Sequence, residues 1–213
     1  MAKAEIMDLT AACQSFPEIP VPQIRRDNIL DTIDMIFEGN TELIVVEGVE
    51  GIGKTTLLAQ FAMRHPNHAL SLFIKPTSRF AYDPGILRFD LCNQLRWTLH
   101  QEELKTPEDA DDAFLRNHLL ELRKRARRNR ETFYFIVDGI DEIPEGFFHS
   151  IDGFLKRKLE VLFGNREVVL SNQDFPAGRF GTKILQERLG EIELQRTAVA
   201  GIDDEGSFIG VIG

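Results

Sequence analysis

The residue types best suited to chemistry lie in the segment GVEGIGKT, residues 48–55, which we call the phosphate loop. The segment matches the pattern G-x-x-x-x-G-K-[ST] at every fixed position. Glycines at this spacing let successive backbone N–H groups surround a phosphate, and the lysine near the end of the pattern reaches the same anion. The threonine hydroxyl is placed to ligate Mg²⁺. The segment therefore predicts a site for the phosphates of a nucleotide.

The expected nucleotide-binding residues run from the first glycine of the loop to the second threonine after it. They are Gly48, Val49, Glu50, Gly51, Ile52, Gly53, Lys54, Thr55 and Thr56. We expect Lys54 to contact the β- and γ-phosphates of ATP and Thr55 to ligate the metal ion. The alternative is a glycine-rich turn between a strand and a helix that binds nothing, which the complete motif disfavours.

A second group of candidates is acidic and follows an apolar run, in the segment FYFIVDGIDE at residues 133–142. An acid at the carboxyl end of a parallel strand lies at the edge of the sheet where such proteins bind ligands. We expect Asp138 to hold Mg²⁺, and Asp141 or Glu142 to orient and deprotonate an attacking water. The alternative is a solvated acidic loop, which becomes less favoured beside a phosphate loop.

The elements that must position these residues alternate along the chain. Short apolar runs predict strands at residues 41–47, 69–75, 132–138 and 167–171, with a weaker one at 191–195. Apolar spacing of three to four predicts helices at residues 29–37, 55–64, 86–100 and 109–128. Residues 202–209 are similar to a helix start with Asp203 as the N-cap. Alternating strands and helices indicate one α/β domain with a parallel sheet covered on both faces.

The segment Asp138-Gly139 with Asp141 and Glu142 resembles the NACHT branch of the STAND proteins, the signal transduction ATPases with numerous domains. In that family a small residue follows the Mg²⁺-binding acid, and further acids lie three and four positions on. The resemblance covers about residues 23–213, with residues 1–22 as a lead-in segment. It implies a three-layer α/β P-loop NTPase of the ASCE type. Its parallel five-stranded sheet would have the order 5-1-4-3-2, with the fourth strand between those that carry the two motifs.

The same resemblance implies an ATP-dependent oligomerisation switch of the kind found in innate-immune sensors and antiviral defence proteins. Family members often carry an arginine near the adenine, a place that Arg25 or Arg26 would fill. At the end of the fourth strand, Asn172 is expected to donate a hydrogen bond to the nucleotide. Gln173 replaces the arginine that is usual there, which implies slow hydrolysis.

The resemblance also implies partners. A STAND switch needs a helical lid, a winged-helix domain and a sensor, and these are expected downstream but absent from this chain, with self-association in the full-length protein. Two other functions stay open. One is an AAA-like ATPase that remodels proteins or nucleic acid, and the other is a module whose bound nucleotide is purely structural.

Composition excludes several other classes. The two cysteines, Cys13 and Cys92, and the five histidines show no metal-ligand spacing, and no disulfide scaffold is expected. The net charge of −9 makes nucleic acid an unlikely partner, and the basic run at residues 123–130 is interpreted as a solvated helix face. No apolar run is long enough to span a bilayer, and the N-terminus lacks the core of a signal peptide. We therefore expect a cytoplasmic protein with no membrane contact.

Overall fold

The computed structural model describes most of the first 155 residues and three strands nearer the C-terminus. The described residues are 12–19, 24–38, 43–48, 51–75, 82–140, 143–144, 146–147, 150–151, 153–155, 185–189, 192–197 and 208–212. Two predicted site segments, residues 49–50 and 141–142, fall outside these ranges, as do Asn172 and Gln173.

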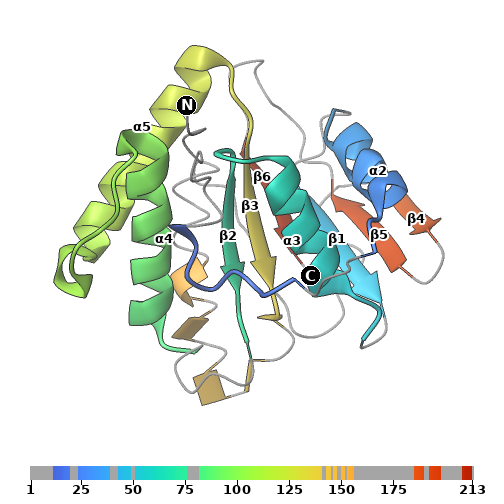
Figure 1. The fold of residues 1–213 in the computed structure, drawn as a ribbon, viewed down its shortest axis with the longest axis horizontal. Helices are drawn as coiled ribbons and strands as arrows, with labels where there is room; N and C mark the ends of the chain where they lie inside the picture. Colours follow the sequence, from blue (N-terminus) through green and yellow to red (C-terminus); the bar gives the residue numbers. More distant parts are fainter. Residues whose placement is uncertain are drawn as a thin grey trace, which may run out of the picture.

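Helices and strands alternate through the first two thirds of the chain (Figure 1). The helices are α2 (Asp27–Glu38), α3 (Lys54–Arg64), α4 (Pro84–His100), the short 3₁₀ turn η1 (Pro107–Asp109) and α5 (Asp112–Asn129). The strands are β1 (Leu43–Gly48), β2 (Ala69–Phe73), β3 (Phe133–Asp138), β4 (Leu185–Leu189), β5 (Ile192–Thr197) and β6 (Phe208–Ile212). The four predicted helices and the first three predicted strands are confirmed, with ends that differ by a few residues.

The strands form one sheet in the order β2-β3-β6-β1-β5-β4. Strands β2, β3, β6 and β1 are parallel to one another, so this part of the molecule is the predicted parallel sheet. One strand separates β1 from β3, as Figure 1 shows with β6 between them. The carboxyl ends of the two motif-bearing strands therefore lie at the same edge of the sheet.

The expected five-strand order 5-1-4-3-2 is not confirmed. The strand expected at residues 167–171 lies outside the described residues. The strand expected at 191–195 is β5, but it pairs antiparallel with β1, and β4 pairs antiparallel with β5. Leu189 at the end of β4 pairs with Ile192 at the start of β5, so only two residues connect these strands. A parallel pair would need a crossover connection of about a dozen residues or more.

The helix start expected at residues 202–209 is wrong at its end, because Phe208 and Ile209 begin strand β6. The sequence FIGVI is apolar and rich in β-branched residues, which suits a central strand between two parallel neighbours. The acidic residues before it, Asp203 to Glu205, favoured the helix start, since acids are common in the first turn of a helix.

The helices cover both faces of the sheet, which gives the expected three layers. Alternate residues of a strand point to opposite faces. Ala69 and Phe73 of β2 and Ile136 of β3 pack with α2 and α3. Leu70 and Leu72 of β2 and Phe133, Phe135 and Val137 of β3 pack with α4 and α5. Within the described part of the chain, no helix is both long enough and apolar enough to cross a membrane.

Residues 12–19 lie against the edge strand β2. The Phe73 amide donates to the Ser15 hydroxyl over 3.1 Å, and the Cys13 thiol donates to the Ser71 carbonyl over 3.3 Å. The buried side chain of Gln94 on α4 both accepts from the Ser71 amide, at 2.8 Å, and donates to the Ser71 carbonyl, at 2.7 Å. Side chains therefore form hydrogen bonds with backbone N–H and C=O groups of β2 that a neighbouring strand would otherwise pair.

The carboxylate of Asp90 on α4 forms hydrogen bonds with residues 12–19. It accepts from the amides of Gln14, at 2.8 Å, and Ser15, at 3.0 Å, and from the side chain of Gln94, at 3.1 Å. Burial raises the pKa of Asp90 despite these hydrogen bonds, and burial beside Asp90 also raises the pKa of the Cys13 thiol. Cys13 is therefore a buried, protonated thiol that packs like a small apolar side chain.

Candidate functional site

The turn from β1 to α3 has the backbone shape that its glycines permit. Gly51 has φ of +77° and Gly53 has φ of +90°, both in the left-handed region where side chains are disfavoured. Gly53 is the N-cap of α3, and its carbonyl accepts the first helical hydrogen bond, from the Leu57 amide at 3.0 Å. The two glycines let the chain turn sharply from the end of the strand into a helix whose first residue is Lys54.

The start of α3 differs from the starts of α4 and α5. Asp83 caps α4 by accepting from the Gly85 amide, and Asp111 caps α5 by accepting from the Phe114 amide. Among the described residues, no side chain caps α3 in this way. The first N–H groups of a helix have no intrahelical partner and carry the positive end of its dipole. The start of α3 is thus suited to an anion, and the first turn of the helix carries no acidic side chain.

Arg26 holds the phosphate loop from the side. Its guanidinium donates to the carbonyl oxygen of Ile52, and a Cβ added to Gly53 would lie 3.0 Å from the same guanidinium. The backbone amide of Arg26 donates to the side chain of Gln60 on α3, which in turn donates to the Ile24 carbonyl over 2.9 Å. A buried glutamine of α3 therefore fixes the segment before α2, and that segment fixes the loop before α3.

Asp138, the last residue of β3, is 5% exposed. Ile212 of β6 pairs with both Val45 of β1 and Val137 of β3. In the register of the sheet, Asp138 therefore aligns with Val46, two residues before the end of β1. Strands β1 and β3 are two spacings apart, about 10 Å. By alternation Asp138 belongs to the sheet face on which α3 packs, with Ile136. The carboxylate is therefore on the side of the sheet where the phosphate loop lies.

Gly139 follows Asp138 in a conformation that excludes a side chain. Its φ is +81°, and a Cβ at this position would lie 2.2 Å from the carbonyl oxygen of Ile74. The Ile74 amide donates to the Asp138 carbonyl over 2.9 Å, which keeps the chain after β2 close to the end of β3. The small residue after the acid is thus required by the close approach of these two segments.

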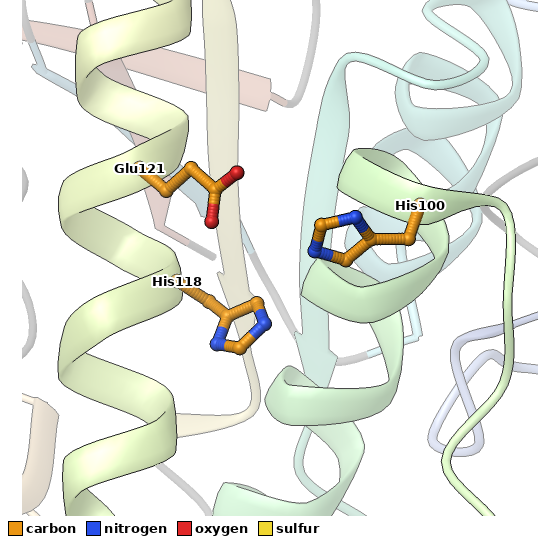
Figure 2. Close-up of side chains that lie close together, drawn as sticks. All are labelled: His100, His118 and Glu121. Carbon is orange, nitrogen blue, oxygen red and sulfur yellow. The ribbon is translucent and has the colours of Figure 1, made fainter.

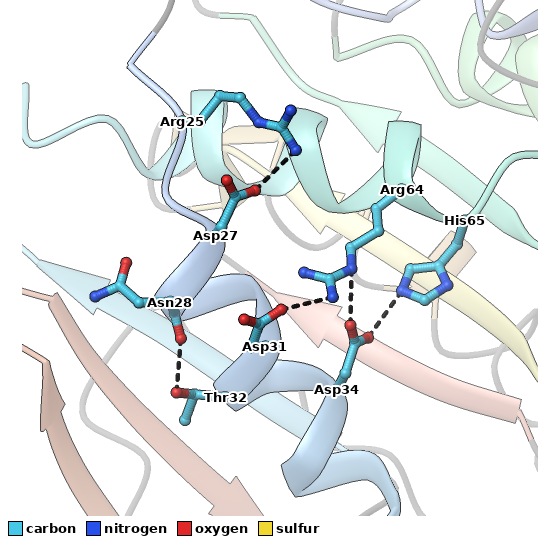
Figure 3. A network of polar contacts seen from close by, with 8 residues as sticks. All are labelled: Arg25, Asp27, Asn28, Asp31, Thr32, Asp34, Arg64 and His65. Carbon is cyan, nitrogen blue, oxygen red and sulfur yellow. Dashed lines mark hydrogen bonds and ion pairs between the residues drawn. The ribbon is translucent and has the colours of Figure 1, made fainter.

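A polar network joins α2 to the end of α3 (Figure 3). Arg64 donates to Asp31 at 2.6 Å and to Asp34 at 3.0 Å, and His65 donates to the other oxygen of Asp34 at 2.8 Å. Burial lowers the pKa of His65, although the Asp34 carboxylate opposes this shift. Burial also raises the pKa of the neighbouring Tyr134 hydroxyl to about 12. The network fixes α2 on α3 at the end opposite to the phosphate loop.

The predicted site residues divide into those that the structure places and those outside its described part. Gly48, Gly51, Ile52, Gly53, Lys54, Thr55 and Thr56 lie at the end of β1 and the start of α3, and Asp138 lies at the same edge of the sheet. Val49, Glu50, Asp141, Glu142 and Asn172 lie outside the described residues. Arg25 is exposed and pairs with Asp27 at 2.9 Å. It lines a cavity of about 600 Å³ between α2 and α3, together with Gln60, Met63 and Arg64.

A family model described as an AAA ATPase domain matches residues 23–163, which is more than half of the chain. The chain belongs to this family. The match covers α2 to β3 and ends before β4, β5 and β6. No curated protein and no solved structure matches the chain. As an AAA ATPase domain, the protein is a nucleotide-binding module of the P-loop NTPase type.

Sequence reasoning missed one part of this AAA domain site. Gln60 is 7% exposed and lies on the apolar face of α3 between Leu57 and Phe61. A side-chain amide on the buried face of a helix needs hydrogen-bond partners. A glutamine among the apolar residues of this helix was therefore the signal in the sequence that a polar contact lies there. Of the two arginines expected near the nucleotide, Arg26 contacts the phosphate loop, whereas Arg25 is hydrogen-bonded to Asp27.

Proposed function

We propose that this AAA domain binds Mg-ATP with its phosphate loop and hydrolyses it slowly. The observation that carries the proposal is the start of α3, where two left-handed glycines precede a helix that no described side chain caps. The residue types fit the ligand. Helix N–H groups and Lys54 suit phosphate oxygens, and the Thr55 hydroxyl and the Asp138 carboxylate are the oxygen ligands that Mg²⁺ prefers.

Each residue would then have one role. Lys54 would neutralise the β- and γ-phosphates, and Thr55 and Asp138 would hold the metal ion. Glu142, with Asp141 as the alternative, would orient the attacking water and accept its proton. A bound Mg²⁺ supplies charge neutralisation to the phosphate oxygens. Arg26 would keep the loop in its binding shape through Ile52, as its hydrogen bond supports.

We also propose that the domain is the regulatory switch of a STAND or NACHT protein in signalling or antiviral defence. The sequence pattern supports this assignment, because the small residue Gly139 follows the expected Mg²⁺-binding acid and further acids, Asp141 and Glu142, lie three and four positions on. In such a protein, nucleotide exchange would drive self-association with the help of lid, winged-helix and sensor domains. Asn172 would contact the nucleotide, and Gln173 in place of an arginine would keep hydrolysis slow.

A second candidate is a remodelling ATPase, which the AAA family match favours. This function needs rapid turnover and a stable ring in which a neighbouring subunit supplies an arginine. The two candidates share the ATP site and differ in rate and assembly.

Binding is tested by titrating the chain with Mg-ATP beside a Lys54→Ala variant. Loss of a charge-assisted contact to phosphate should weaken binding by about 10- to 150-fold. Lys105→Ala is the matched control, because Lys105 is exposed and lies in the segment between α4 and α5. Equal affinities for the wild type and Lys54→Ala would remove the phosphate-loop assignment.

Turnover and assembly separate the two functions. A switch of this kind should release phosphate at or below about 10⁻² per second and stay mainly monomeric as this chain alone. Turnover above roughly one per second with a stable ring by light scattering would favour the remodelling ATPase. Glu142→Gln should spare ATP binding and slow phosphate release, and the same result from Asp141→Asn alone would move the catalytic role to Asp141.

A further inference from the structure

Three potential metal ligands come together on the helix pair that covers the other face of the sheet. His100 is the last residue of α4, and His118 and Glu121 lie one turn apart on α5. One ligand atom from each residue lies within 4.8 Å of the others. Figure 2 shows the two imidazoles and the carboxylate turned toward the space between the helices. We call His100, His118 and Glu121 the α4–α5 site.

His118 is held in an orientation that suits metal binding. Its Nδ1 lies 2.9 Å from the carbonyl oxygen of Phe114, one turn earlier on α5. A carbonyl only accepts hydrogen bonds, so Nδ1 carries the proton and Nε2 keeps its lone pair in the neutral ring. The Phe114 ring also stacks on the imidazole, with the centroids 3.8 Å apart. Metal-binding histidines usually have such a second hydrogen bond, which fixes the ring and its tautomer.

The other two ligands are accessible. His100 and Glu121 are exposed and His118 is half-buried, so an ion can enter from solvent. The His100 ring meets the His118 ring edge-on at 5.7 Å. Among the described residues, Glu121 has neither a hydrogen-bond partner nor an ion-pair partner. Arg125, one turn further along α5, is engaged elsewhere, with the Glu131 carboxylate at 3.0 Å and the Thr98 carbonyl at 2.8 Å.

We propose that the α4–α5 site binds a divalent transition metal ion, with Zn²⁺ as the best match. Two imidazoles and one carboxylate are a known zinc ligand set, with water in the fourth position. Zinc–nitrogen bonds of about 2.0–2.1 Å require the ligand atoms to move closer together, which rotation of the exposed His100 and Glu121 side chains allows. The bound ion ties the end of α4 to the middle of α5. This proposal is independent of the nucleotide site, because α3 packs on the opposite sheet face.

The test is a zinc titration of the whole chain, carrying no affinity-tag histidines, in competition with a chromogenic zinc chelator and in excess Mg²⁺. The wild type should bind one Zn²⁺. His118→Ala and His100→Ala should each weaken binding by about 10- to 100-fold, and Glu121→Gln by about 10-fold. His68→Ala is the control, because His68 is outside the site and its ring donates locally to the Pro66 carbonyl oxygen. It should bind zinc like the wild type.

Two further readouts keep the result interpretable. Saturating Zn²⁺ should raise the melting temperature of the wild type relative to a chelator, but should leave the His100→Ala/His118→Ala double variant unchanged. Co²⁺ should give the visible absorption of a four-coordinate site with the wild type only. Circular dichroism checks that the variants are folded. Equal zinc affinity in the wild type and the double variant, or an equal loss in His68→Ala, would overturn the proposal.

Discussion

The guanidinium of Arg26 is hydrogen-bonded to the carbonyl oxygen of Ile52, inside the phosphate loop. Arg26 also directly precedes α2, and its carbonyl accepts from the amides of Ile29, at 2.9 Å, and Leu30, at 3.0 Å. One residue therefore connects the start of α2 with the loop that precedes α3. A movement of α2 relative to the sheet would therefore disturb this contact with the loop.

Arg26→Ala should weaken Mg-ATP binding by about 3- to 10-fold, because the loop loses a contact that holds its shape before the nucleotide binds. Arg25→Ala is the matched control, since Arg25 is exposed and its ion pair with Asp27 is at the surface. It should change the affinity by less than about twofold. Calorimetric titration of both variants measures the difference. A larger effect from Arg25→Ala would return the adenine-side role to that residue.

Gly139→Ala should destabilise the domain. The new Cβ would lie 2.2 Å from the Ile74 carbonyl oxygen, at a φ of +81°. Strain and displacement together should cost about 2–4 kcal/mol, or about 5–15 °C in melting temperature. Gly153→Ala is the control, because a Cβ added there would have nothing within 4 Å and the residue is helical. Thermal unfolding that is equal in the two variants would contradict the close approach of Gly139 to Ile74.

Folding stability should fall as the pH is lowered below about 6.5, the usual pKa of histidine. Burial lowers the pKa of His65 in the folded state, so the unfolded chain binds more protons between that lowered value and 6.5. The contribution of His65 to the free energy of unfolding is therefore fully present above pH 6.5. It is lost as the pH falls from 6.5 to the lowered pKa. Melting temperatures between pH 5.5 and 7.5 measure the slope. His65→Gln should flatten it, whereas His68→Gln should not.

Asp90→Ala should release residues 12–19 from α4 and the edge of β2. The variant removes the acceptor of the Gln14 and Ser15 amides. Limited proteolysis should then cut this segment about tenfold faster, the effect of losing roughly 1.4 kcal/mol of local stability. Asp90→Asn should be intermediate, because an amide offers one acceptor oxygen instead of two. Asp109→Ala, at an exposed position beside Thr106, is the control. Unchanged cleavage in Asp90→Ala would show that other contacts hold the segment.

The sequence was sufficient for elements whose signal is local. The spacing of Leu57, Leu58, Phe61 and Ala62 predicts α3, and the apolar run before Asp138 predicts β3, because a buried face imposes the same period on the residues. The phosphate loop was predictable for a related reason: the left-handed backbone at Gly51 and Gly53 restricts which residues fit there.

Features that depend on distant residues were not predictable. The position of β6 between β1 and β3 is set by pairing with both strands, and the residues just before it suggested a helix. His100 and His118 show no ligand spacing along the chain, and the packing of α4 against α5 brings them together. The choice between Arg25 and Arg26 as the neighbour of the phosphate loop likewise needs the fold, since both precede the same helix.

The amide of Gln94 acts on Ser71 as a neighbouring strand would, by offering one acceptor and one donor at the spacing of a peptide group. A sheet edge that is satisfied in this way is a poor template for another chain, because no unpaired backbone groups remain at Ser71 to recruit one. The self-association proposed above would therefore not continue one sheet into the next through β2 at Ser71. The same feature disfavours edge-to-edge pairing through β2 at high local concentration.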